Sequence, residues 1–120
     1  MLKKQNRLKS RSAFSATYNN NHSEADNSIV LYIGHEKNEK NCPTRVGFVV
    51  SKKIHKRAVV RNKIKRLIRE NVRLMIKNND FPMRYQSVIF VARNSILNKS
   101  YNQIRQEIEK IINKIAKYNI

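Results

Sequence analysis

Cysteine, glycine and proline are all scarce in this sequence. Its 120 residues include one Cys, two Gly, two Pro and no Trp. Cys42 has no partner for an internal disulfide and no catalytic-looking neighbour, so we expect it to be incidental. With so few turn residues, the chain shows neither a linker nor an internal repeat. We therefore predict one domain over residues 1–120.

Long apolar runs are missing as well. No stretch approaches the roughly 20 apolar residues that cross a bilayer. The longest runs have only a few residues, such as Val88 to Ala92. The N-terminus is basic, but no apolar signal-peptide core follows it. These absences argue against a membrane protein, and we expect a cytoplasmic one.

Acidic residues are few compared with basic ones. The chain has 8 Asp and Glu against 26 Lys and Arg, which gives a formal net charge of +18. Such a charge repels itself unless a polyanion neutralises it. We expect nucleic acid, and RNA in particular, to be that polyanion. An anionic membrane surface is the second candidate.

Hydrophobic patterning predicts three helices and three strands. Helical periodicity predicts helices over 10–18, 57–77 and 98–117, and apolar β-branched runs predict strands over 28–33, 45–51 and 87–92. The polar segments 19–27 and 35–44 are predicted to be loops. The resulting order, α-β-β-α-β-α, predicts an α+β two-layer sandwich with a small mixed sheet.

The predicted helix over 57–77 separates its apolar and basic residues. Its apolar residues Val60, Ile64, Leu67, Ile68, Leu74 and Met75 fall within about 120° of a helical wheel, and Arg61, Asn62, Lys65, Arg66, Arg69 and Arg73 fill an adjoining arc of about 140°. We call this second arc the charged arc. A merely solvated helix face mixes both signs so that ion pairs can form. Between Lys52 and Arg73, however, the only acid is Glu70. Bound phosphates would supply the missing counter-charge.

The same segment resembles a known family. The run Val49-Val50-Ser51-Lys52-Lys53, followed by Arg61-Asn62-Lys63-Ile64-Lys65-Arg66, is similar to the protein subunit of bacterial ribonuclease P. The hallmark of that family is Arg-Asn-Arg leading into Ile/Val-Lys-Arg, on a helix that follows a Gly-x-x-Val-Ser-Lys-Lys strand. Here Lys63 replaces the third residue of the hallmark and keeps its charge.

The similarity extends over nearly the whole chain. Arg7-Leu8, Leu31-Tyr32 and the strand from Val88 to Arg93 also match the family. Two features depart from it. The turn Ile54–Arg57 replaces a shorter, Gly-containing one, and Gln86 stands where Asp is common.

The resemblance implies a fold, two RNA partners and a catalytic role for the RNA in place of the protein. The basic helix would connect two parallel strands with a left-handed crossover, against the usual right-handed rule. The partners would be ribonuclease P RNA and precursor tRNA, with no obligate protein partner. The RNA would remove the 5′ leader with magnesium ions that it holds itself. The protein would then have no catalytic residue, no metal site and no cofactor.

The resemblance also assigns residues to two sites. The RNA subunit is expected to contact the basic helix at Arg57, Arg61, Asn62, Lys63, Lys65, Arg66 and Arg69. A cleft between the first helix and the sheet is expected to hold the leader with Phe14, Tyr18, Tyr32, Phe48, Lys52 and Lys53. Stacking combined with charge holds a single strand without reading its sequence. Aromatic residues in such elements are often core instead, and Phe48 is the one for which that is most expected.

Three other functions compete with this interpretation. An enzyme with its own active site would need a catalytic cluster, but His22, His35 and His55 are isolated and lack metal-ligand spacing. A ribosomal protein or RNA chaperone would share the charge, but would not prefer precursor over mature tRNA. A membrane-active helix would need a broader exposed apolar face than residues 57–77 can provide.

Overall fold

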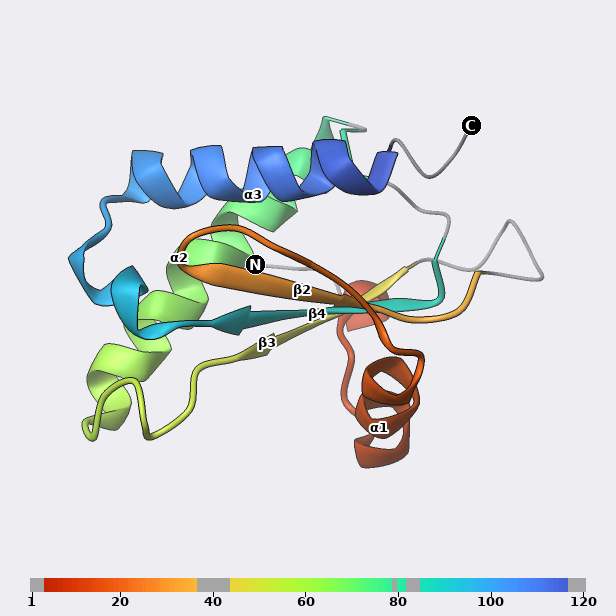
Figure 1. The fold of residues 1–120 in the computed structure, drawn as a ribbon, viewed down its shortest axis with the longest axis horizontal. Helices are drawn as coiled ribbons and strands as arrows, with labels where there is room; N and C mark the ends of the chain where they lie inside the picture. Colours follow the sequence, from red (N-terminus) through yellow and green to blue (C-terminus); the bar gives the residue numbers. More distant parts are fainter. Residues whose placement is uncertain (1–3, 37–43, 79, 82–84, 117–120) are drawn as a thin grey trace.

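The structure is a computed structural model that describes residues 4–36, 44–78, 80–81 and 85–116. Two short 3-10 helices, three α-helices and four strands occur in these ranges (Figure 1). In chain order they are η1 (Lys4–Asn6), α1 (Arg11–Asn19), β1 (His22–Ala25), β2 (Ile29–Ile33), β3 (Arg45–Val49), α2 (Ala58–Lys77), β4 (Ser87–Ala92), η2 (Asn94–Asn98) and α3 (Tyr101–Ala116). Cys42 and the predicted helix end at Lys117 lie outside the described residues.

The four strands form one mixed sheet in the order β1-β2-β4-β3. The β1–β2 and β2–β4 pairs are antiparallel, and the β3–β4 pair is parallel. Helix α2 connects the two parallel strands. The predicted α+β class with a small mixed sheet is confirmed, while the handedness of the crossover stays a prediction.

One predicted loop is wrong, because residues 19–27 contain the edge strand β1. Its four residues pair with β2, from His22 opposite Ile33 to Ala25 opposite Val30. The strand is polar and none of its residues is fully buried. Backbone pairing with β2 stabilises it, so its side chains carry no apolar signal that a sequence pattern could detect.

Two other predicted boundaries shift for local reasons. The strand predicted over 45–51 ends at Val49, because a turn follows in which the Ile54 N–H donates to the Ser51 carbonyl at 3.0 Å. The last helix begins at Tyr101 instead of 98. There Ser100 and Gln103 form a capping box, with the Gln103 N–H donating to Ser100 Oγ at 3.2 Å and the Ser100 N–H donating to Gln103 Oε1 at 2.8 Å.

Helices α2 and α3 cover one face of the sheet and form the core with it (Figure 1). Alternate residues of each strand point into this layer. The strand residues of the core include Ile29, Leu31, Ile33, Val46, Val88 and Phe90, and the helix residues include Ile64, Ile68, Ile104 and Ile108. Glu107 of α3 is also buried, where it accepts hydrogen bonds from the N–H and hydroxyl of Ser28. Helix α3 is thereby joined to the start of β2.

Helix α1 lies against the opposite face of the sheet (Figure 1). Thr17 shares a hydrogen bond with Ser87 at 2.5 Å, and Asn20 Nδ2 donates to the Ile33 carbonyl at 3.0 Å. The ring of Phe14 sits over Gly47, where a Cβ atom would come within 2.7 Å of the ring. Glycine is therefore required for this close approach of α1 to β3.

Candidate nucleic-acid interface

Helix α2 presents the charged arc to solvent. Its buried residues are Ile64, Ile68, Asn71 and Val72, which face the sheet and α3. The predicted RNA-subunit contacts lie on α2 or just before it, and none of them is buried. Asn62, Lys63 and Arg66 are exposed, Arg61, Lys65 and Arg69 are partly exposed, and Arg57 precedes the helix in an exposed position.

Arg61 has a structural contact that its sequence position does not reveal. Its Nη1 atom donates to the carbonyls of His55 at 3.0 Å and Lys56 at 2.7 Å. The Arg57 N–H donates to His55 Nδ1 at 3.1 Å in the same turn. Arg61 therefore closes the turn that leads into α2, in addition to carrying a charge.

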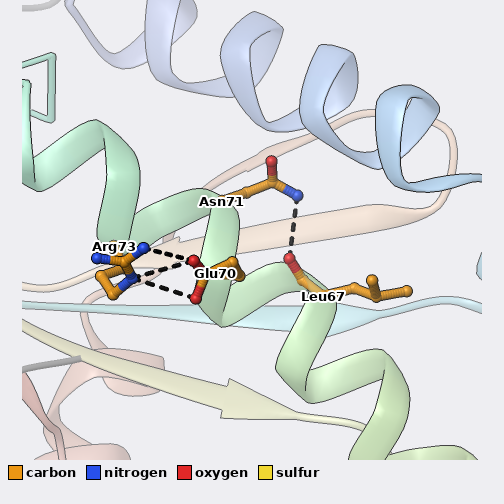
Figure 2. A network of polar contacts seen from close by, with 4 residues as sticks. All are labelled: Leu67, Glu70, Asn71 and Arg73. Atoms are coloured by element: carbon orange, nitrogen blue, oxygen red, sulfur yellow. Dashed lines mark hydrogen bonds and ion pairs between the residues drawn. The ribbon is translucent and has the colours of Figure 1, made fainter. Parts of the chain in front are cut away.

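Two further arginines of the charged arc have partners on the protein. The Arg69 guanidinium lies over the Phe48 ring, 5.6 Å from its centre. Arg73 holds the Glu70 carboxylate with two nitrogens, at 2.5 and 3.1 Å (Figure 2). Hydrogen bonds from Arg73 and its positive charge lower the pKa of Glu70, and the same pair raises the pKa of Arg73.

Two residues of the charged arc, and Lys63 beside it, remain available to a ligand. Within the described ranges, the side chains of Lys63, Lys65 and Arg66 have no hydrogen-bond or ion-pair partner. Lys63 and Arg66 are three residues apart, and Lys65 is four residues from both Arg61 and Arg69, so like charges repel along the helix. Phosphate groups would relieve this repulsion.

A pocket joins the charged arc to the aromatic residues. It has a volume of about 270 Å³ and lies at the outer edge of β3, between α1, α2 and the N-terminal segment. Its lining residues are Arg7, Leu8, Lys9, Phe14, Val46, Gly47, Phe48, Lys65 and Arg69. We call it the β3-edge pocket. It brings Phe14 and Phe48 of the predicted leader cleft to Lys65 and Arg69 of the predicted RNA-subunit surface.

The N-terminal segment contributes two candidate site residues, Arg7 and Lys9, that the sequence did not predict. The Leu8 N–H donates to the Val46 carbonyl at 2.9 Å, and Arg7 forms an isolated bridge with Val46. This pairing at the free edge of β3 positions Arg7 and Lys9 at the β3-edge pocket. Only the basic composition of the N-terminus hints at this role.

Tyr18 and Tyr32 meet on the α1 face of the sheet. Their rings are in edge-to-face contact with centres 4.9 Å apart, and both side chains are partly exposed. Burial and the neighbouring Tyr32 hydroxyl raise the pKa of Tyr18. Beside them, the partly exposed Val30, Val49 and Val91 share the same sheet face by register. We call this partly covered surface, together with Phe14, the aromatic groove, after the cleft that the resemblance predicts.

Phe48 does not belong to the aromatic groove. Its neighbour Gly47 faces α1, so Phe48 faces the opposite side of the sheet. There its ring stacks on Phe90, with centres 5.9 Å apart and an angle of 11° between the planes. Phe48 is therefore mainly a core residue, and its ring also lines the β3-edge pocket.

Lys52 and Lys53 lie beyond the Val49 end of the aromatic groove, away from its two tyrosines. They lie exposed in the turn between β3 and α2. In Figure 1 this turn is at one end of the sheet, and α1 is below the other end. The structure thus groups these lysines with the start of α2 and not with Tyr18 and Tyr32.

Neither a metal cluster nor a membrane helix occurs in the described part of the chain. No three His, Cys, Asp or Glu residues of these ranges are close enough to hold a metal ion. No helix of the same ranges is long and apolar enough to cross a membrane.

The fold and the candidate site define a small, strongly basic α+β protein whose charged helix lies next to an aromatic groove. The chain belongs to the ribonuclease P family, because the family model described as Ribonuclease P matches residues 2–116. This confirms the resemblance found in the sequence. Family membership assigns the chain to transfer-RNA processing, as a protein subunit of an endoribonuclease.

Similar proteins come from several bacteria. The ribonuclease P protein component of Symbiobacterium thermophilum is 38% identical over 112 residues, which cover 92% of this chain and 90% of the relative. That of Clostridium kluyveri is 39% identical over 115 residues, with 93% and 96% covered. The solved RNase P protein of Staphylococcus aureus is 34% identical, with a TM-score of 0.75 and 95% and 97% of the chains covered. The Thermotoga maritima protein has a TM-score of 0.74, with 90% and 96% covered, but is only 20% identical and shows the fold alone.

Proposed function

We propose that this chain binds ribonuclease P RNA with the charged arc and the 5′ leader of precursor tRNA with the aromatic groove. The observation that carries this proposal is the β3-edge pocket, where Lys65 and Arg69 of α2 meet Phe14 at the end of the groove. One continuous surface can then contact two RNA segments. The protein acts in the cytoplasm, where its RNA subunit and its substrate are present.

Contact with the RNA subunit depends on the unpaired residues of α2. Lys63, Lys65 and Arg66 reach solvent, and their charges have no partner among the described residues. Arginine holds a phosphate with two parallel hydrogen bonds, and lysine holds it as a point charge. Arg61 has only part of its guanidinium free, since one nitrogen is bonded to the turn before α2.

Contact with the leader depends on rings and charges at the groove. A nucleobase stacks on an aromatic ring whatever its identity, which suits a protein that must accept leaders of many sequences. Phe14 and Tyr32 are partly exposed, so their rings can reach a base. Arg7, Lys9 and Arg69 at the β3-edge pocket provide charges for the phosphates between the bases.

The protein supplies binding and orientation, and the RNA supplies the chemistry. Magnesium ions, held by the RNA, would supply the chemistry of phosphodiester hydrolysis. In this proposal the protein side chains hold the substrate and take no part in the chemical step.

Reconstitution tests this function. The protein is mixed with ribonuclease P RNA of its host at low magnesium, and removal of the leader is measured with the wild type, Arg66→Ala and Lys110→Ala. Lys110 is exposed on α3, so its variant removes the same charge away from the charged arc. We expect the wild type and Lys110→Ala to restore cleavage, and Arg66→Ala to require more protein. Equal activity of both variants, or no stimulation by the wild type, would contradict the proposal.

A further inference from the structure

A second pocket lies between the C-terminal half of α2 and α3. Its volume is about 300 Å³, and the residues that matter here are Asn71, Leu74, Met75, Asp80, Glu109 and Ile112. We call it the α2–α3 pocket. Asn71 and the charged arc lie on opposite sides of α2, so the nucleic-acid interface proposed above does not use this pocket.

Asn71 has a buried oxygen without a partner at this pocket. The residue is 2% exposed, and its Nδ2 donates to the Leu67 carbonyl at 3.0 Å. Rotating the amide would place two carbonyl oxygens together, so the orientation is fixed. Its Oδ1 has no hydrogen-bond partner among the described residues. Figure 2 shows this oxygen directed away from α2, toward α3. A buried acceptor that stays unsatisfied is costly, so a donor is expected to fill this position.

The charges around the α2–α3 pocket indicate a cationic donor. Asp80 and Glu109 line it, although the whole chain contains only 8 acids. Arg105 also lines the pocket, and its Nε donates a hydrogen bond to Glu109 at 3.1 Å, so the Arg105 charge offsets that of Glu109. Asp80 is held through its backbone, whose N–H donates to the Met75 carbonyl at 2.8 Å. The Asp80 carboxylate has no side-chain partner among the described residues.

The walls of the α2–α3 pocket distinguish between kinds of cation. Leu74, Met75 and Ile112 provide apolar surface next to the acceptors. A magnesium ion keeps a shell of oxygen ligands and several waters, and gains nothing from such walls. An ammonium group on an alkyl chain uses both parts, because its N–H groups reach the acceptors while its methylenes cover the walls.

We propose that the α2–α3 pocket binds a primary alkylammonium ion, as found at the end of a polyamine. The ammonium group donates to Asn71 Oδ1 and to the Asp80 carboxylate, and its methylenes lie against Leu74, Met75 and Ile112. The site is separate from the RNA surface, so its failure would leave the proposed function intact.

NMR titration of the full chain with n-butylammonium and spermidine tests this proposal. We expect saturable shifts of the Asn71 side-chain NH₂ and of the Met75 and Ile112 amides. Loss of a hydrogen bond to a charged group weakens binding by about tenfold or more, so Asp80→Asn and Asn71→Leu should each show at least this loss. Asp26→Asn, which removes an acid elsewhere, should bind as the wild type does.

Three results would overturn the proposal. Tetramethylammonium, which has no N–H donor, or Mg²⁺ could cause the same shifts at the same residues. Shifts could also spread over all acidic residues without saturating, as expected for loose counterions. Finally, Asn71 could fail to respond at all, which would mean that the pocket holds only water. Asp80 is exposed, so Asp80→Asn keeps the test decisive even if Asn71→Leu does not fold.

Discussion

The two faces of the sheet are made by the same strands but differ in how completely they are covered. In β2, Ile29, Leu31 and Ile33 are 0% exposed, whereas the alternating Val30 and Tyr32 are partly exposed. Helices α2 and α3 cover the first face with 20 and 16 residues. Helix α1 has only 9 residues and covers part of the second.

This difference in burial suits the two faces to different tasks. The fully covered face excludes water and provides most of the hydrophobic stabilisation. The partly covered face leaves rings and valines accessible in a groove whose shape is held by the core behind it. A rigid sheet with one dry face can therefore position a ligand on its other face.

The largest difference between the two faces is expected in how much a substitution on each face lowers the free energy of unfolding. Phe90 is 0% exposed and stacks on Phe48, so Phe90→Ala should lower the free energy of unfolding by about 3–5 kcal/mol. Val91 is the next residue but faces the groove, and Val91→Ala should cost about 1 kcal/mol. Denaturant titration of both variants measures the difference. Similar losses would mean that the two faces are equally buried.

The next effect concerns how the affinity of the charged arc for the RNA subunit depends on salt concentration. If about six phosphates are neutralised, log affinity for the RNA subunit should fall with log salt concentration at a slope of about −4 to −5. Arg66→Ala should make this slope less steep by about 1. Tyr18→Ala, on the groove side, should leave it unchanged. Binding that does not depend on salt would rule out a phosphate interface.

The third effect concerns the groove. A base stacked on a ring contributes roughly 1–3 kcal/mol, so Tyr18→Ala should weaken precursor binding by about 5- to 150-fold. Mature tRNA has no leader, and its binding should barely change. Both affinities are measured with the assembled holoenzyme, and circular dichroism checks folding. If the folded variant keeps its full preference for precursor, Tyr18 does not contact the leader.

The smallest effect separates two arginines of the charged arc. Arg61→Ala removes the hydrogen bonds to His55 and Lys56 and should cost about 1 kcal/mol of stability. Arg66 has no such contact in the described structure, so Arg66→Ala should stay within about 0.5 kcal/mol of the wild type. Thermal unfolding compares the two. Equal melting temperatures would show that the Arg61 contact is not maintained in solution.

Much of the fold could be predicted because the spacing of apolar residues along the chain indicates which side chains are buried. The strand predicted over 87–92 is confirmed as β4, and the helix predicted over 57–77 begins only one residue later, at Ala58. The charged arc also follows from the sequence, because helix geometry alone sets which residues share a side. Strand β1 was missed because backbone pairing, and not apolar side chains, maintains it.

The candidate site was predictable only in part. The sequence could identify Phe14, Tyr32 and Phe48 as candidates for the leader cleft. It could not predict the sheet face on which each ring lies. The register places Tyr32 in the groove and Phe48 in the core. Asn71 is polar in the middle of the apolar side of α2, and this pattern could have drawn attention to the α2–α3 pocket.

The sequence by itself determined the family, the fold class and the separation of apolar and basic residues around α2. These depend on composition, on the order of the helices and strands, and on local periodicity. Only the tertiary structure decided that Lys65 and Arg69 meet Phe14 in one pocket, that Arg61 closes a turn and that Lys52 and Lys53 lie far from α1. These facts depend on strand pairing and helix packing between residues distant in the chain. No local pattern contains them, since each arises from the way separate elements share one core.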